Sequence, residues 1–217
     1  MLYTIQNHLK DFLSFLKKPT DEFTLPISMA SKFKIVLIFF IIELPVSLAS
    51  ILFISGLEAA NIINTENHAI ETLFKTMSTT AFFFLVVIID PFVEELIFRL
   101  SLRYETNLFI GISIRFGNLF FDREKAAQFD LALNRKWSRF YPKFFYFSAL
   151  LFGLVHLVNY EISPAILLFS PILVASQIVG GLIIGFLRVR HGFWTGYMMH
   201  SFHNLVYIGI GIIGMQL

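Results

Sequence analysis

Several stretches of this chain are apolar for long enough to cross a lipid bilayer. A bilayer core of about 30 Å needs about 20 apolar residues in one helix. The apolar runs lie at Phe33–Ile54, Met77–Leu102, Phe144–Val158, Ser163–Leu187 and Gly192–Met215. They are continuous rather than alternating, which favours helices over the strands of a membrane barrel. We therefore predict an all-α polytopic membrane helical bundle, with about five to seven transmembrane helices and a central polar intramembrane site.

The composition agrees with this class and excludes several others. The chain is 56% hydrophobic and 15% charged, whereas soluble domains are about 45–50% apolar and about 25% charged. It has no cysteine, which excludes disulfides, thiolate nucleophiles and cysteine-ligated metal. The net charge of +2 comes without a basic stripe bearing interleaved aromatic residues, so nucleic acid is not an expected partner.

The first part of the chain differs from the remainder. Residues 1–31 open polar and lack the pattern of a cleaved signal peptide. They contain a short run with apolar residues at helical spacing, namely Leu9, Phe12, Leu13 and Leu16, flanked by lysines. This pattern predicts an interfacial amphipathic segment, followed by a transmembrane domain over residues 32–217.

The placement of Lys and Arg predicts the orientation in the membrane. Asn107–Phe121 is apolar but short, so it is expected to be interfacial or re-entrant, and Asp122–Lys143 reads as the main polar loop. If residues 107–121 do not cross, every Lys and Arg except Lys75 falls on one side, which favours five crossings with a cytoplasmic N-terminus. Glu94 and His156 both come late in their spans, however, and antiparallel helices would separate them. The expected location is the inner or plasma membrane, with several passes.

Four charged residues interrupt the apolar run "VVIIDPFVEELIFRL". Each costs about 2.5–3.5 kcal/mol at the centre of a membrane helix, so such residues usually face the interior of the bundle and mark a function. Asp90 precedes Pro91, a pair that predicts a start or a kink of the helix with Asp90 as its N-cap. Glu95 and Arg99 are four residues apart and share a helix face, where they can neutralise each other. Glu94 is turned by about 100° from that face, so it is the carboxylate available for chemistry.

Two further polar clusters lie in later apolar runs. "FGLVH" ends at His156, and "HSFHN" holds His200 and Asn204 four residues apart on one face. A carboxylate, two imidazoles and a carboxamide from three helices suit water activation combined with oxyanion stabilisation.

Three other residues of the spans fit structural roles better. Phe152 is expected to pack. Glu43 lies near Pro45 in the first span, where it would cap a broken turn or line a cavity. His203 lies on a face that flanks the one shared by His200 and Asn204.

The chain carries three motifs in order within its apolar runs: Glu-Glu-x-x-x-Arg, Phe-x-x-x-His and His-x-x-x-Asn. Together they resemble the motifs of the CPBP family of CaaX proteases and bacteriocin-processing proteins. This family includes the Ras-converting CaaX endopeptidase. The resemblance covers roughly residues 81–208. It implies an intramembrane glutamate-type endopeptidase that uses no metal or other cofactor and acts on a peptide or membrane-protein substrate.

The resemblance also implies a role for each motif residue. Glu94 matches the general base that activates water together with His156. His200 and Asn204 match the pair that stabilises the oxyanion, and Glu95 and Arg99 match the supporting carboxylate and arginine.

The chain departs from the family pattern in two places. Leu100 stands where the family often has glycine, and the stretch between Arg99 and Phe152 is long, so it would serve as a lid or a partner surface. The modest length favours the bacterial branch, for which cleavage of a prenylated tail is not implied.

Three other functions fit parts of the pattern. Glu94, His156 and His200 could ligate zinc as a His₂Glu site, although no His-Glu-x-x-His helix is present. The bundle could instead be a non-catalytic scaffold or a bacteriocin-immunity-type protein. A proton-coupled transporter would also use buried acids and histidines, but no repeated halves are recognisable.

Overall fold

The structure is a computed structural model that describes residues 2–24, 27–64 and 69–216, and these residues form helices without a strand. The α-helices are α1 (Leu2–Lys17), α2 (Met29–Ala59), α3 (Ala69–Thr76), α4 (Thr79–Phe84), α5 (Asp90–Phe98), α6 (Leu108–Phe120), α7 (Arg123–Val155), α8 (Pro164–Leu173), α9 (Ala175–His191) and α10 (Phe193–Gln216). A π-helix, η1 (Leu85–Ile89), joins α4 to α5. Short 3₁₀ turns are η2 (Leu100–Leu102), η3 (Tyr104–Thr106) and η4 (His156–Asn159). The all-α prediction is confirmed.

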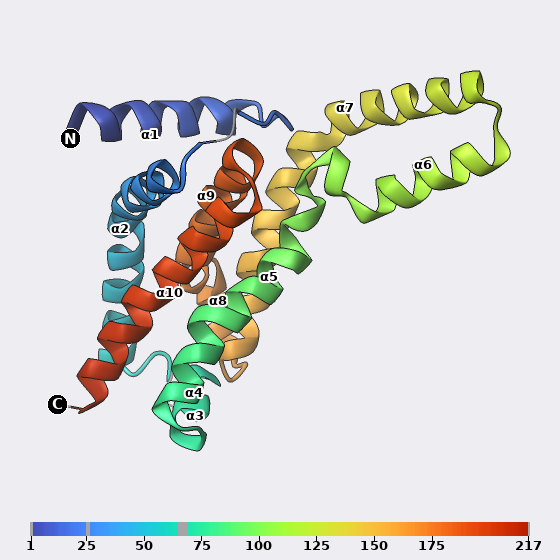
Figure 1. Ribbon diagram of the computed structural model, residues 1–217. Coiled ribbons are helices and arrows are strands. Elements are labelled where there is room, and N and C mark those ends of the chain that lie inside the picture. Colours follow the sequence, from blue (N-terminus) through green and yellow to red (C-terminus); the bar gives the residue numbers. More distant parts are fainter. Residues whose placement is uncertain (1, 25–26, 65–68, 217) are drawn as a thin grey trace.

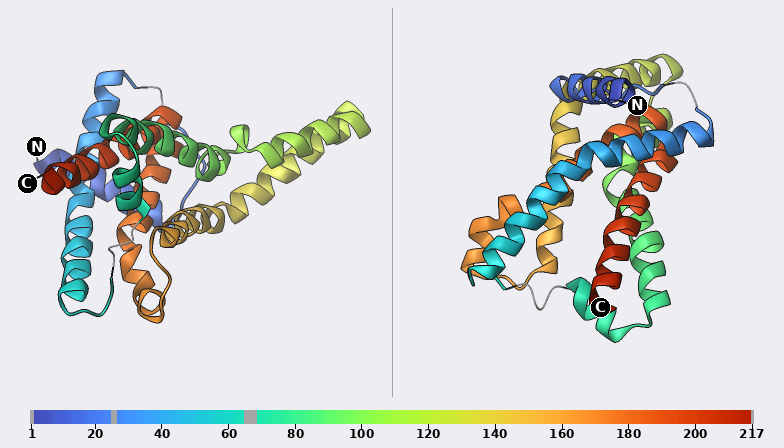
Figure 2. Two further views of the ribbon diagram at one scale, coloured as in Figure 1. Left: turned by 90° about the horizontal axis from the view of Figure 1, so that it is seen from below. Right: turned by 90° about the vertical axis from the view of Figure 1, so that its left-hand side faces the viewer.

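The long helices run side by side, as expected for a polytopic membrane bundle (Figure 1). Within the described residues, three helical segments are long and apolar enough to cross a membrane: Met29–Ala59, Arg123–Asn159 and Pro164–His191. The α4–η1–α5 run and α10 lie alongside them (Figures 1 and 2). Helix α1 lies across one end of the bundle and buries Phe12 and Phe15 against Phe186. The predicted domain boundary after residue 31 stays a prediction.

The segments rich in Lys and Arg gather at the end of the bundle where α1 lies. The start of α2, the end of α5, the α6–α7 hairpin and the α9–α10 turn are all at this end, whereas α3, with Lys75, is at the other (Figure 1). The basic segments therefore share one end of the bundle, whereas the number of crossings and the cytoplasmic side stay predictions.

The prediction of a polar loop at Asp122–Lys143 is wrong, because these residues are helical. Asp122 caps α7 and accepts a hydrogen bond from the backbone N–H of Lys125, which lowers the pKa of its carboxyl. The segment is rich in Ala, Leu, Lys, Arg and Glu, which are strong helix formers, so its polarity marked an exposed helix and not a loop. Together with α6, the first part of α7 forms a hairpin that projects away from the bundle (Figures 1 and 2).

The run predicted as one span at Ser163–Leu187 is two helices. Helix α8 ends at Leu173, and α9 begins at Ala175 after Val174, which leaves helical geometry. Pro171 lies inside α8 and does not account for this break, because a proline disturbs the helix on its N-terminal side.

Glycines allow α7 and α9 to approach closely. A Cβ on Gly153 would lie 2.3 Å from Cγ1 of Ile178, and one on Gly181 would lie 3.1 Å from the Phe152 ring. Small residues have this use in membrane bundles, where close van der Waals packing drives helix association. Because α7 carries Phe152 and ends at His156, this packing also sets the position of two site residues.

We expect Gly153→Ala to lower the stability of the protein by about 1–3 kcal/mol, as overpacking does in a tight core. Gly56→Ala is the matched control, since a Cβ there meets nothing within 4 Å, and its better helix propensity should raise stability by up to about 1 kcal/mol. Thermal unfolding in one detergent measures both. Adding Ile178→Ala should restore part of the loss, and equal melting temperatures for the two single variants would contradict the packing argument.

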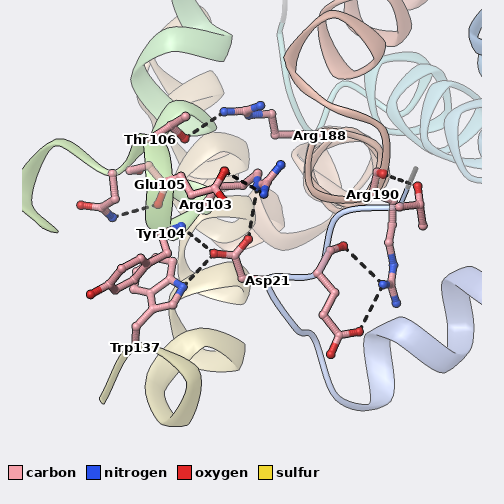
Figure 3. A network of polar contacts seen from close by, with 12 residues as sticks. Asp21, Arg103, Tyr104, Glu105, Thr106, Trp137, Arg188 and Arg190 are labelled. Atoms are coloured by element: carbon pink, nitrogen blue, oxygen red, sulfur yellow. Dashed lines mark hydrogen bonds and ion pairs between the residues drawn. The ribbon is translucent and has the colours of Figure 1, made fainter. Parts of the chain in front are cut away.

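A polar network holds the segment that follows α5 (Figure 3). Asp21 accepts hydrogen bonds from the backbone N–H of Tyr104 at 2.5 Å and from Nε1 of Trp137 at 3.0 Å. Its other oxygen lies 3.5 Å from Nε of Arg103. The polypeptide between α1 and α2 is thereby tied to η3 and to α7.

Arg188 of α9 ties the same segment to the bundle. Its Nε donates to the backbone carbonyl of Arg99 at 3.3 Å, and its Nη2 donates to Oγ1 of Thr106 at 3.0 Å. Since Arg99 is the residue directly after α5, these contacts fix the end of the helix that carries both glutamates.

Candidate active site

The α5 helix enters the site through a π-helix. The expected start or kink at Asp90-Pro91 is confirmed, because α5 begins at Asp90 directly after the π-helix. The expected N-cap role of Asp90 is wrong: Ile89 and Asp90 have helical backbone angles, and no side chain caps the helix there. Pro91 has no N–H for the carbonyl four residues earlier. The chain adapts by widening one turn, in which the N–H of Asp90 donates to the carbonyl of Leu85.

Side chains of α10 satisfy carbonyl groups of this widened turn. Nδ2 of Asn204 donates to the carbonyl of Val86 at 2.9 Å, and the hydroxyl of Tyr197 donates to that of Ile88 at 3.2 Å. The π-helix therefore joins α10 to the helix that carries the glutamates, which matches the frequent presence of π-bulges at functional sites.

Glu95, Arg99 and His200 form a buried hub. The side chains of Glu95 and Arg99 are fully buried, and Nε of Arg99 lies 3.7 Å from Oε1 of Glu95. The spacing of four residues predicts this pair. The same Glu95 oxygen lies 3.1 Å from Nδ1 of His200, so the supporting carboxylate joins α5 to α10.

Glu94 contacts the other ring nitrogen of the same histidine. Its Oε2 lies 3.3 Å from Nε2 of His200. Its partner thus comes from a different helix, because the one-residue step along α5 turns Glu94 away from the Glu95–Arg99 face. A neutral imidazole carries one proton, so His200 can pass a proton between the two carboxylates.

Phe152 lies between the cationic and imidazole groups. The guanidinium carbon of Arg99 is 3.7 Å from the centre of its ring, and the rings of His156 and His200 meet it edge-on at 4.7 and 5.6 Å. Phe152 packs as expected, but its neighbours are three functional groups. The cation–π contact stabilises the guanidinium of Arg99 against the face of the ring.

His156 ends α7 with a defined tautomer. Its Nδ1 lies 2.8 Å from the carbonyl oxygen of Phe152. A carbonyl only accepts hydrogen bonds, so Nδ1 carries the proton and Nε2 keeps a free lone pair. His156 can therefore accept a proton from water or orient a water molecule at Nε2.

The predicted site residues fall into two groups, those that line a cavity of about 390 Å³ and those that do not. Glu94, His156, His200 and Asn204 line it, whereas Glu95 and Arg99 are buried behind them. The four side chains expected to contact the reacting groups thus share one space, although they come from three helices. The projecting hairpin, which consists of α6 and the first part of α7, does not line the cavity, whereas the last turn of α7 does.

Two lining residues were missed as functional candidates. Glu43 of α2 was expected to have a structural role, and His203 was expected on a flanking face. They form a pair, with Nδ1 of His203 3.1 Å from Oε1 of Glu43, and both line the cavity. An acidic residue inside the first span was the available signal, but only the packing of α2 on α10 reveals its partner.

The chemistry of the donor set bears on the zinc alternative. In the parts of the chain that the structure describes, no three His or carboxylate side chains are arranged to hold one metal ion. The zinc hypothesis therefore gains no support from the geometry and is left to experiment.

Comparison with known proteins gives one match. A family model described as type II CAAX prenyl endopeptidase Rce1-like matches residues 76–206, which is more than half of the chain. The match includes both glutamates of α5, Arg99, His156, His200 and Asn204, and it begins after Glu43. Neither the curated proteins nor the solved structures contain a match to this chain.

Proposed function

The chain belongs to the Rce1-like family of type II CAAX prenyl endopeptidases, and from this premise we propose that it hydrolyses a peptide bond inside the membrane with water activated by Glu94 and His156. The family makes it a CAAX-type protease with a peptide substrate, and its apolar helices make it a membrane protein. The observation that carries the proposal is the separation of the glutamates, with Glu94 on the cavity wall and Glu95 buried against Arg99.

In the proposed first step, Glu94 removes a proton from a water molecule that His156 orients through Nε2. The oxygen of the water forms a bond to the carbonyl carbon of the substrate, and the carbonyl π-electrons move onto its oxygen. The negative charge on that oxygen is stabilised by hydrogen-bond donors held beside it.

Asn204 and His200 are the proposed donors. Asn204 uses one amide proton on the carbonyl of Val86 and has a second one free for the oxyanion. His200, held at Nδ1 by Glu95, becomes an Nε2–H donor when it receives the proton that Glu94 took from water. Collapse of the intermediate breaks the C–N bond, and this proton moves to the leaving amine.

We expect the purified protein, reconstituted in lipid vesicles, to cleave membrane-associated peptides and to keep full activity in excess chelator. Mass spectrometry of the products locates the cleaved bond, and metal analysis of the same sample accompanies the assay. Loss of cleavage in chelator with recovery on adding zinc would replace this mechanism with the metal-dependent one. If no peptide is cleaved while changes in the α6–α7 hairpin alter a cellular phenotype, the scaffold function is supported instead.

A further inference from the structure

Glu43 is a buried carboxylate that the proposed reaction does not use. It lies in the middle of α2, its side chain is 1% exposed, and it lines the same cavity as Glu94. Within the described residues, neither of its oxygens receives an aligned hydrogen bond. Its nearest polar neighbour is Nδ1 of His203, whose side chain is 27% exposed to the cavity side.

The chain leaves room for this carboxylate. A Cβ on Gly180 of α9 would lie 3.1 Å from Oε1 of Glu43, and the next nearest atom would be the carboxyl carbon at 3.9 Å. A side chain at position 180 would therefore press on the carboxylate and displace it. The glycine of α9, the glutamate of α2 and the histidine of α10 together form one wall of the cavity.

The burial of this carboxylate leaves lone pairs that a donor in the cavity can satisfy. A buried ion pair stabilises a fold only when its remaining lone pairs are satisfied by hydrogen bonds, and a carboxylate inside a membrane bundle is costly without them. Among the described residues the contact of Oε1 with Nδ1 of His203 at 3.1 Å is the nearest to a hydrogen bond that Glu43 has, so a donor that enters the cavity would add hydrogen bonds to this carboxylate.

The position of the pair relates it to the bond that is cut. His203 is three residues after His200 on α10, so the two side chains start about 5–6 Å apart on the helix surface. An extended peptide advances about 3.3 Å per residue. A peptide whose scissile carbonyl lies at His200 therefore reaches Glu43 roughly two residues away.

We propose that Glu43 and His203 form a substrate-recognition subsite that binds an N–H donor of the substrate about two residues from the scissile bond. This inference rests on the proposed function. The donor is either a backbone amide or the ammonium or guanidinium of a Lys or Arg side chain, because a carboxylate with unsatisfied lone pairs accepts from both.

The test uses fluorogenic peptides that the reconstituted protein cleaves, varied at each position around the scissile bond. Glu43→Gln should raise KM about tenfold, which is the loss expected for one hydrogen bond to a charged group, and should lower kcat by less. If the donor is a side chain, replacing Lys or Arg in the peptide by norleucine removes the difference in KM between the Glu43→Gln protein and the unchanged protein. N-methylation of one backbone amide removes it if the donor is the main chain.

Two further variants separate recognition from folding. Gly180→Ala keeps the charge but pushes on Glu43, and should reproduce the rise in KM for the same peptides. Ser50→Ala is the control, because Ser50 is a buried polar residue of α2 that does not line the cavity, and it should change neither KM nor binding. An unchanged KM in Glu43→Gln, or a lower melting temperature with an equal effect on all peptides, overturns the inference.

A binding measurement keeps this test independent of turnover. Fluorescence anisotropy reports the affinity of the labelled peptides for the Glu94→Gln protein, and adding Glu43→Gln should weaken it about tenfold. If nothing is cleaved but this weakening is seen, the proposed function fails while the subsite stands. If cleavage depends on Glu94 and the affinity does not depend on Glu43, only the subsite fails.

Discussion

Replacing Glu94 by glutamine should reduce peptide cleavage by about 10²–10⁴-fold, the usual contribution of a positioned general base. Glutamine has nearly the same shape, so it keeps the packing around His200 but cannot take a proton from water. Because Glu94 lies on the cavity wall and not in the buried hub, the variant should fold with an unchanged melting temperature. The measurement is kcat/KM on one peptide, with thermal unfolding of the same preparations.

The control for this variant is Glu105→Gln. Glu105 is a carboxylate at the end of the bundle, where it pairs with Arg103 and is 76% exposed, so its replacement should leave cleavage unchanged. Glu94→Asp should keep part of the activity, because its carboxylate is withdrawn by one methylene but still accepts a proton. Full activity in Glu94→Gln would remove Glu94 from the mechanism.

Replacing Arg99 by methionine should lower the free energy of unfolding by about 3–5 kcal/mol, which is the usual cost of removing one member of a buried ion pair. Glu95 would remain fully buried, and among the residues that the structure describes its remaining hydrogen-bond partner would be His200. The Phe152 ring would also lose the guanidinium that lies 3.7 Å from its centre. Denaturation in mixed micelles and the residual activity after heating measure the effect.

Comparison with two other variants identifies the cause of this loss. Arg115→Met changes an exposed arginine of α6 and should have little effect, because exposed charges contribute about 0–1 kcal/mol. Arg99→Met combined with Glu95→Gln should be less destabilising than Arg99→Met alone, since no charge is left buried without its partner. A double variant that is less stable than Arg99→Met would contradict the pairing.

Local spacing accounts for the contacts that could be predicted. Glu95 and Arg99 are one helical turn apart on one helix, so their contact follows from helix geometry alone, and the structure has it at 3.7 Å. The helical class and the common end of the basic segments also follow from composition and charge placement. The antiparallel order of helices was expected to separate Glu94 from His156, yet both line one cavity, with His156 directly after the end of α7.

The errors came from features that depend on neighbouring helices or on exposure. Asp122–Lys143 is polar because the hairpin of α6 and α7 projects from the bundle, and not because it lacks a helix. Asp90 was expected to cap the helix before Pro91, whereas α5 continues from a π-turn whose carbonyls accept hydrogen bonds from Asn204 and Tyr197 of α10.

The amino-acid sequence by itself determined the helical membrane class of the protein and the family motifs that it carries, since length, hydropathy and spacing along one helix are local properties. Only the tertiary structure decided which groups meet. His200 lies between Glu94 and Glu95, Phe152 lies among Arg99 and two imidazoles, and Glu43 contacts His203 in one wall of the cavity. Such contacts depend on the rotation and depth of each helix in the bundle, which are set by close packing at positions such as Gly153 and Gly180 and not by the residues of any one helix.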